Sequence, residues 1–305
     1  MSKVSIVIPV YYNADTLIPL YHDMKAKILD KLDYELVFVD DGSGDDSWNI
    51  MNQIKEMDSN VVLVKLSRNF GEHAALLAGL STSTGDCAVT KQADLQEDSE
   101  IILEMYERWK NGYKVVLAVR EKRDEGFVKK FFARLYYMLI RSYVNKQMPL
   151  QGCDCYLLDR QVIGVLEMLD ERNSSLTLQV LWTGFKSDNV YIHRRNREIG
   201  KSRWTLKKKL RLVMDSLMSF SEVPIRIMSG VGLLFFIIAC VLAVLVVLEY
   251  FLLGTPMIGW TSLMCVALLS FGIMMLAMGV LGEYIWRTLD ASRNRPPFLI
   301  DEIRK

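Results

Sequence analysis

The sequence predicts an α/β domain with a mostly parallel sheet, followed by a hairpin of two membrane-spanning helices. Short β-branched runs alternate with helical stretches over the first 200 residues, which is the pattern of βαβ units. Two long runs without a charged residue follow, at 227–248 and 251–282. A chain of 305 residues can hold one domain of about 200 residues together with such an appendage.

The first domain is expected to alternate strand and helix along the chain. Strands are predicted where short apolar runs rich in Val and Ile occur, at 4–10, 34–40, 60–66, 86–91 and 113–119. Helices are predicted between them, at 14–31, 45–57 and 98–110. Parallel strands need such crossover connections.

Each uncharged run is long enough to cross a bilayer, which takes about 20 apolar residues at 1.5 Å rise to cover roughly 30 Å of hydrocarbon. Gly254-Thr255-Pro256 interrupts the second run and leaves 260–282 as its span. A pair of buried core helices is the alternative, but core helices rarely run this long without a charge. Both runs lie far from the N-terminus, so neither is a signal peptide.

Basic residues predict the orientation of the hairpin. The segment 194–211 carries nine Lys or Arg against one Glu, the tail carries Arg287, Arg293 and Arg295, and the hairpin turn carries none. The positive-inside rule then predicts a multi-pass protein of the cytoplasmic membrane with both termini in the cytoplasm. The net charge of +1 hides a basic collar suited to lipid or phosphate, and no feature predicts a nucleic-acid partner.

Apolar residues recur at helical spacing next to this collar. Leu206, Leu210, Val213, Leu217 and Phe220 form a stripe beside basic residues, which predicts an amphipathic helix on the bilayer surface, with core packing as the alternative. The expected division is a transferase-sized domain at 1–200, a basic loop and interfacial helix at 201–225, the hairpin at 226–286 and a cytoplasmic tail at 287–305.

The five cysteines are an odd number without paired spacing, and we interpret them as reduced thiols. Cys153-x-Cys155, in a chain with three His, is a poor metal site. Gly42-x-Gly44 stands alone, so the glycine-rich dinucleotide fingerprint is absent and a nicotinamide enzyme is not expected.

Polar residues follow the ends of the predicted strands, where parallel sheets bind ligands. Two acids at one strand end can form a turn with a helix cap. Together with a second acidic strand end and an arginine on the same edge, they instead predict a nucleotide pocket. The predicted donor-binding residues are Pro9, Tyr11, Asp40, Asp41, Ser43, Arg68, Gln92 and Ala93, with Arg120 at the next strand end.

Six motifs in order resemble the family 2 polyprenyl-phosphate glycosyltransferases, which include the bactoprenol glucosyltransferases and the dolichyl-phosphate mannose synthases. They are VSIVIPVYYN, VFVDDGSGDDS, LSRNFG, QADLQED, GCDCYLLDR and GKSRW. With the C-terminal hairpin, the resemblance covers nearly the whole chain. It implies a GT-A fold and inverting transfer of a sugar from a nucleotide diphosphate to undecaprenyl or another polyprenyl phosphate on the cytoplasmic face.

The resemblance also implies a metal site. The family pattern DADLQDP aligns with residues 92–98, so that Asp94 and Gln96 would hold Mg²⁺ or Mn²⁺ and Asp94 would be catalytic. Gln92 occupies the position of the first aspartate. Such metals accept one or two protein carboxylates together with water and phosphate oxygens, so Asp94 suffices. The amide at Gln92 removes one negative charge, which should weaken metal binding before the nucleotide arrives.

On the acceptor side, the resemblance implies that Asp154 is a catalytic aspartate. The family has an arginine at the position that Tyr156 occupies in this chain. A phosphate monoester, with a second pKa near roughly 6, is already largely ionised at neutral pH, so a base is needed little. Lys201, Ser202 and Arg203, with Arg120, are predicted to bind the acceptor's phosphate. A solvated basic loop is the alternative for residues 201–203.

Two other functions remain open at this point. A processive polysaccharide synthase shares the nucleotide domain, but such synthases usually have more spans and a Gln-x-x-Arg-Trp motif, and here Gly200 precedes Arg203-Trp204. A catalytically silent nucleotide-sugar binder would explain Gln92 and Tyr156. The bacterial resemblance favours a UDP-hexose donor, whereas the sugar's identity and a homo-oligomeric state are not fixed by the sequence.

Overall fold

The structure, a computed structural model, describes residues 2–121, 134, 137–138, 140–142, 144–169, 175–193, 215–216, 218–253 and 259–305. The chain forms two compact units. The first comprises Met1–Ser216 together with Arg295–Lys305, and the second comprises Leu217–Asn294.

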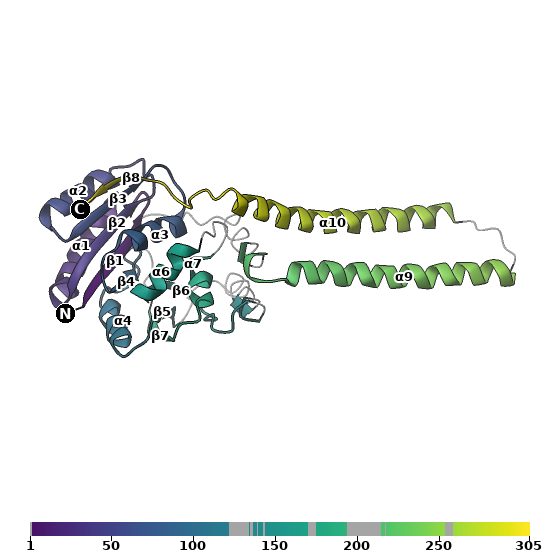
Figure 1. Ribbon diagram of the computed structural model, residues 1–305, viewed down its shortest axis with the longest axis horizontal. Coiled ribbons are helices and arrows are strands. Elements are labelled where there is room, and N and C mark those ends of the chain that lie inside the picture. Colours follow the sequence, from purple (N-terminus) through teal and green to yellow (C-terminus); the bar gives the residue numbers. More distant parts are fainter. Residues whose placement is uncertain are drawn as a thin grey trace. The chain divides into compact units, whose positions relative to one another are not determined.

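The first unit is built on a mixed sheet of eight strands in the order β7-β5-β6-β4-β1-β2-β3-β8 (Figure 1). The strands are β1 Lys3–Val10, β2 Asp33–Asp40, β3 Val61–Leu66, β4 Cys87–Thr90, β5 Val115–Arg120, β6 Cys153–Asp159, β7 Ser187–Ile192 and β8 Ile300–Arg304. Only β6 and β8 run antiparallel to their neighbours. The mostly parallel sheet predicted from the sequence is confirmed.

Helices connect the strands and cover the sheet. They are α1 Ala14–Lys27, α2 Ser47–Met57, α3 Glu72–Thr82, α4 Ile101–Lys110, α6 Arg160–Met168 and α7 Leu176–Trp182, with a 3₁₀ turn η1 at Leu29–Lys31. The helix expected at 14–31 therefore ends at Lys27 and tightens into this turn, in which Leu29 is buried.

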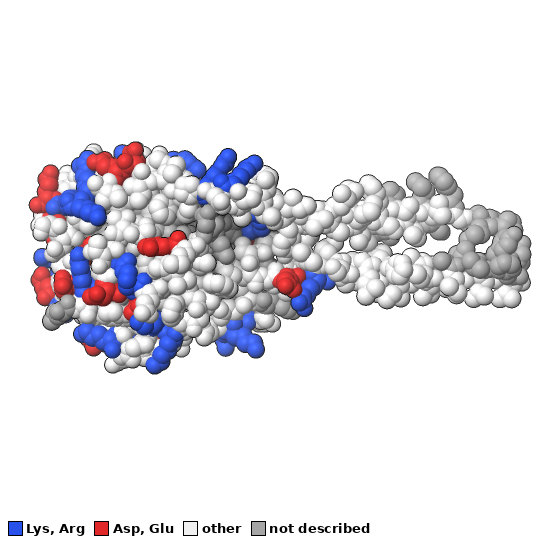
Figure 2. Space-filling view, in the orientation of Figure 1, with Lys and Arg blue, Asp and Glu red and all other residues white. Residues whose placement is uncertain are grey.

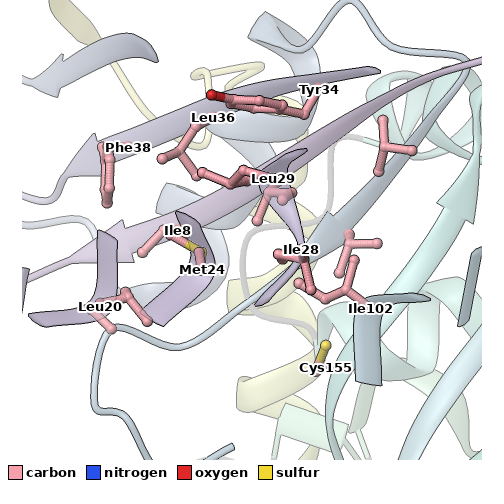
Figure 3. Packing of buried hydrophobic residues seen from close by; sticks show 14 of the residues in the cluster. Ile8, Leu20, Met24, Ile28, Leu29, Tyr34, Leu36, Phe38, Ile102 and Cys155 are labelled. Carbon is pink, nitrogen blue, oxygen red and sulfur yellow. The ribbon is translucent and has the colours of Figure 1, made fainter. Parts of the chain in front are cut away.

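Successive side chains of the central strands point to opposite faces of the sheet, and both faces are apolar. On one face, Ile8 and Phe38 pack with Leu20 and Met24 of α1 in the main buried cluster (Figure 3). On the other face, α3 lies against β1 and β2, and a Cβ on Gly79 would collide with the side chains of Val7 and Val39. Gly79 therefore allows α3 to pack closely against β1 and β2.

Strand β1 marks the point at which the winding of the sheet reverses. The chain runs from β1 to β2 and β3 on one side and then crosses to β4 on the other side of β1. In open α/β sheets, ligands bind outside the carboxyl ends of the strands at such a switch point. Ligand-binding residues are therefore expected among those that follow β1, β2 and β4.

The C-terminal segment closes the β3 edge of the sheet. Strand β8 pairs antiparallel with β3 (Figure 1), and Ser67 N donates to Leu299 O at 3.0 Å. Arg304 Nη1 donates to Asn52 Oδ1 at 2.6 Å, and its guanidinium lies over the Trp48 ring. Of the stretch 287–305 that the sequence assigns to a tail, residues 295–305 thus belong to the first unit and cover an otherwise open edge, whereas residues 287–292 continue α10.

The second unit consists of two long helices that contact one another, α9 Val223–Leu253 and α10 Trp260–Ser292. Their 31 and 33 residues span about 46 and 50 Å at 1.5 Å rise. Both are long and apolar enough to cross a membrane, with candidate spans at Val223–Leu242 and Leu269–Ser292. Figure 2 shows that the drawn face of the pair is largely without charged side chains. Residues 201–214 and 217 of the predicted interfacial helix lie outside the described residues.

Candidate active site

The polar residues predicted from the sequence follow strands that point the same way. Strands β1 to β5 are mutually parallel, because β6 is antiparallel to both β4 and β5. Their carboxyl ends therefore share one edge of the sheet. The loops on this edge are connected by hydrogen bonds in three places.

The first connection joins the end of β1 to the loop after β2. Tyr12 N donates to Ser43 Oγ at 3.1 Å, and Asn13 N donates to Ser47 Oγ at 3.0 Å. Tyr12 has a φ of 56°, which is uncommon for a residue with a bulky side chain and is held by these contacts. Tyr11 lies next to Tyr12, with their ring centroids 4.7 Å apart, and the donor contacts of Tyr11 and Ser43 stay a prediction.

Asp40, the last residue of β2, is buried and accepts from Ser43 N at 3.1 Å. Burial raises the pKa of its carboxyl above the ordinary value, although the hydrogen bonds from Ser43 act in the opposite direction. Pro9 pairs with Val39 in the neighbouring register position and is also buried. Pro9 and Asp40 are thus buried parts of the sheet, and their contact with the donor stays a prediction.

The second connection is made by Asp41, which is 3% exposed. Its Oδ1 accepts from Phe70 N at 2.7 Å, and its Oδ2 accepts from Gly71 N at 2.9 Å and from Asn69 Nδ2 at 3.0 Å. Asp41 therefore holds the loop after β3 and the start of α3. Its contact with the nucleotide stays a prediction, whereas its hydrogen bonds to the residues before α3 are observed.

The pKa of Asp41 is raised to about 6, mainly by burial. Hydrogen bonds from Phe70 and Gly71 lower it, whereas the charges of Asp40 and Glu72 raise it further. Because the folded chain binds this proton more tightly than the unfolded chain, the contribution of Asp41 to stability falls as the pH rises from about 4 to about 6. In the same interval, the carboxylate that accepts two backbone N–H groups is formed.

We expect donor binding to weaken as the pH falls through about 6, because protonated Asp41 is a poorer acceptor for the loop at Phe70 and Gly71. Equilibrium binding of the predicted nucleotide-sugar donor should be measured without the predicted acceptor, since a phosphate monoester also titrates near pH 6. Asp41→Asn should bind weakly at every pH and lack the inflection. An unchanged inflection in this variant would assign the pH dependence to another group.

Gly42 allows two loops to approach one another. Its φ is +70°, and a Cβ on it would lie 2.6 Å from Asn69 N and 2.7 Å from the carbonyl carbon of Arg68. Both obstacles are backbone atoms, which cannot move away as a flexible side chain can. The Asp-Asp-Gly sequence therefore has a steric reason beyond turn formation.

Gly42→Ala should destabilise the first unit by about 2 kcal/mol or more, because it combines a left-handed φ with a backbone collision. Donor affinity should fall with it. Thermal unfolding and donor titration measure the two effects. Gly164→Ala, in the open middle of α6, is the matched control and should leave stability unchanged or higher. Equal stability of the two variants would contradict the steric argument.

The third connection involves the loop after β4. Gln92 Nε2 donates to Glu72 Oε1 at 2.7 Å, and Ala93 and Asp94 are buried. Asp94 Oδ1 accepts from Gln96 N at 3.2 Å around Leu95. Leu95 has a φ of 58°, which costs of order 1–3 kcal/mol for a residue other than glycine and is typical of functional sites.

The donor set of this loop fits Mg²⁺ or Mn²⁺. Asp94 supplies a carboxylate and Gln96 an amide oxygen, and hard cations prefer such oxygens. Within the described part of the chain, no group of three His, Cys, Asp or Glu could hold a metal ion. Asp94 and Gln96 would leave positions for phosphate oxygens and water around such a cation, and this metal site stays a prediction.

The predicted acceptor side lies at the neighbouring strands. Asp154 is in β6, and the register pairs Ala118 with Cys155 but Val119 with Cys153, so that the ladder skips Asp154. β-bulges of this kind are over-represented next to active sites. The backbone of Asp154 therefore lies on the carboxyl edge close to the end of β5, where Arg120 is half-buried.

The remaining predicted residues fall into two groups. The side chain of Asp154, and residues Lys201, Ser202 and Arg203, lie outside the described part of the structure. Arg68 is exposed, with its guanidinium 4.0 Å from the centre of the Phe70 ring. Tyr156, which replaces the family's arginine, is 3% exposed in β6 and is part of the packed sheet.

Glu72 was not predicted from the sequence, and Asn69, although it follows a predicted strand, was not among the predicted donor-binding residues. Glu72 is the first residue of α3, and Asn69 belongs to the LSRNFG motif. The motif itself was a signal for Asn69. Glu72 has no local signal, because its partner Gln92 is 20 residues away in the sequence.

The structure thus combines a mostly parallel α/β sheet, with polar residues in the loops at its switch point, and two apolar helices that are long enough to cross a membrane. The chain belongs to glycosyl transferase family 2, whose model matches residues 5–167. It is a glycosyltransferase with a GT-A-like fold, as the sequence predicts.

Full-length relatives extend this assignment. A prophage bactoprenol glucosyl transferase homolog of Escherichia coli (strain K12) is 33% identical, over 99% of this chain and 100% of the relative. An undecaprenyl-phosphate 4-deoxy-4-formamido-L-arabinose transferase of Enterobacter sp. (strain 638) is also 33% identical, over 99% and 93%. An uncharacterized glycosyltransferase of Bacillus subtilis (strain 168) is 37% identical, over 98% and 93%.

Among solved structures, a mannosyltransferase of Pyrobaculum calidifontis in complex with GDP-mannose and Mn²⁺ matches with a TM-score of 0.49 and 16% identity. The match covers 65% of this chain and 58% of that one.

Proposed function

We propose that the protein transfers a hexose from a UDP-sugar to undecaprenyl phosphate at the cytoplasmic face of the membrane, with inversion at the anomeric carbon. The observation that carries this proposal is the path of the chain. It leaves the first unit after Ser216, forms two helices of membrane-spanning length, and returns at Arg295 to the first unit. Such helices would hold the first unit at the bilayer, where a lipid acceptor is found.

The names of the full-length relatives support the acceptor. One is a bactoprenol glucosyl transferase homolog and another acts on undecaprenyl phosphate. Their similarity extends over 99% of this chain and so includes the helices as well as the domain. A lipid phosphate acceptor is therefore consistent with both the sequence similarity and the two apolar helices.

The pairing of β8 with β3 supports the proposed orientation. Because residues before α9 and after α10 share one sheet, the two helices must cross the membrane as a hairpin if they cross it at all. The basic segment 194–211 and the tail arginines support a cytoplasmic position for both ends. Nucleotide sugars and the active-site edge would share that compartment.

In this reaction the protein mainly positions the donor and the acceptor and stabilises the charge on the leaving diphosphate. An ionised phosphate oxygen of the acceptor attacks the anomeric carbon, and the bond to the nucleotide diphosphate breaks on the opposite face, which inverts the configuration. Asp94 and Gln96 would hold a divalent cation, which supplies positive charge to the leaving diphosphate. Asp41 and Gly42 shape the donor pocket, and Asp154 orients the acceptor from the bulge in β6.

The test is a donor panel. Membranes containing the protein are incubated with undecaprenyl phosphate and, separately, with radiolabelled UDP-glucose, UDP-galactose, UDP-N-acetylglucosamine and GDP-mannose. One UDP-hexose should place label in the organic phase. Label in a water-soluble polymer would indicate a processive synthase instead, and binding without transfer of any label would indicate a silent nucleotide-sugar binder.

A further inference from the structure

Glu72 is a half-buried carboxylate at the edge of the donor site that the reaction above does not use. Its Oε1 accepts from Gln92 Nε2 at 2.7 Å. Gln92 is two residues before Asp94 in the loop after β4, and Glu72 is the first residue of α3. One hydrogen bond therefore joins the start of α3 to the loop that carries the proposed metal ligands.

The position of Glu72 is fixed from its other side as well. Gly71 N and Phe70 N donate to the two oxygens of buried Asp41 at 2.9 and 2.7 Å, and Gly71 O accepts from Ala75 N at 3.0 Å within the first turn of the helix. Glu72 is thus attached to the end of β2 through Asp41 and to the end of β4 through Gln92.

The geometry of an amide determines what this contact does to Gln92. The nitrogen and oxygen of a carboxamide lie on opposite arms of one plane, so donation by Nε2 to Glu72 directs Oε1 away from Glu72. A hydrogen bond to a carboxylate is also stronger than one between neutral groups, and it polarises the amide toward a more negative Oε1. The pair carries one negative charge in total, as a single carboxylate does.

We propose that Glu72 and Gln92 act together as the second acidic element of the metal–diphosphate site, with Glu72 as the positioning residue that orients and polarises the Gln92 amide. The inference rests on the proposed function and adds one feature to it. Gln92 lacks the negative charge of the aspartate that the family has at this position, and Glu72 at the start of α3 supplies a negative charge instead. The ligand class is a divalent cation bound to a nucleoside diphosphate.

The test measures binding of Mn²⁺ and UDP to the full-length protein by electron paramagnetic resonance, without acceptor or turnover. Glu72→Gln keeps the size and an acceptor oxygen but removes the charge. We expect it to weaken Mn²⁺ binding in the presence of UDP by roughly 10-fold, since outer-shell partners of metal ligands are worth 10–100-fold. The double variant Glu72→Gln with Gln92→Glu exchanges donor and acceptor, keeps the total charge, and should return to within about 3-fold of the natural protein.

Glu104→Gln is the matched control, because Glu104 forms an ion pair with Arg108 on the surface of α4 and its removal should leave Mn²⁺ binding unchanged. Thermal unfolding of each variant separates binding from folding. Unchanged Mn²⁺ affinity in Glu72→Gln would overturn the inference, as would a double variant that folds but binds no better than the single one. Absence of Mn²⁺–UDP binding in the natural protein would instead contradict the proposed metal-dependent function.

Discussion

Asp94→Asn is expected to reduce sugar transfer by roughly 10²–10³-fold, the range measured when one electrostatic stabiliser of a transition state is removed. Asp94 is the carboxylate between Gln92 and Gln96 in the loop after β4, and it is 7% exposed. The asparagine retains an oxygen that can accept from Gln96 N, as Asp94 Oδ1 does, so the loop should keep its shape. The loss should therefore come from charge and metal binding, and it is measured by initial rates across a Mn²⁺ titration.

Asp98→Asn provides the control in the same loop. Asp98 Oδ1 accepts from Lys27 Nζ at 3.0 Å, and this partly exposed pair contributes little to stability. The variant should keep most of the activity. If Asp94→Asn were as active as Asp98→Asn, or if the natural protein worked equally well in excess chelator, the metal site would be wrong.

Asp154→Asn is expected to lower the rate of transfer by roughly 10²-fold while leaving donor affinity nearly unchanged, because positioning of the acceptor contributes at the transition state rather than to nucleotide binding. The motivating observation is the bulge that removes Asp154 from the β5–β6 ladder at the carboxyl edge of the sheet. The effect on the rate is measured as kcat, and the effect on donor affinity is measured by a separate titration of the donor.

Glu121→Gln is the comparison for this variant, because Glu121 is exposed directly after β5 on the same edge. It should change neither quantity. Parallel loss of donor binding and activity in Asp154→Asn would move Asp154 to the donor pocket or to a purely structural role.

The parallel core of the fold could be predicted because its signals are local. Runs such as VSIVIPV and YELVFVD are rich in β-branched residues, and β1 and β2 are found within one residue of the predicted bounds. Strand β8 could not be predicted in this way. Its sequence, IDEIR, is short and charged, and it becomes a strand through pairing with β3 and through the contacts of Arg304 with Asn52 and Trp48.

In the candidate site, too, local features could be predicted from the sequence, whereas contacts between distant segments could not. The residues after each strand could be selected from the sequence, because parallel strands bring their carboxyl ends to one edge. The partners of those residues could not. Asp41 resembles a nucleotide ligand in the sequence, whereas its two oxygens accept from residues 69–71. Gln92 resembles a loss of charge, whereas its amide donates to Glu72. Both contacts join segments that only the folded chain brings together.

The most direct test of the central claim is transfer by the purified full-length protein in phospholipid vesicles that contain undecaprenyl phosphate. The UDP-hexose selected by the donor panel is added with Mn²⁺ or Mg²⁺, and label is followed into the organic phase. Parallel vesicles contain undecaprenol, which has the same chain but no phosphate. We expect a labelled lipid only in vesicles with the phosphate, and release of an equal amount of UDP in the same reaction. Equal labelling of both vesicle types, or UDP release without any labelled lipid, would contradict transfer to undecaprenyl phosphate.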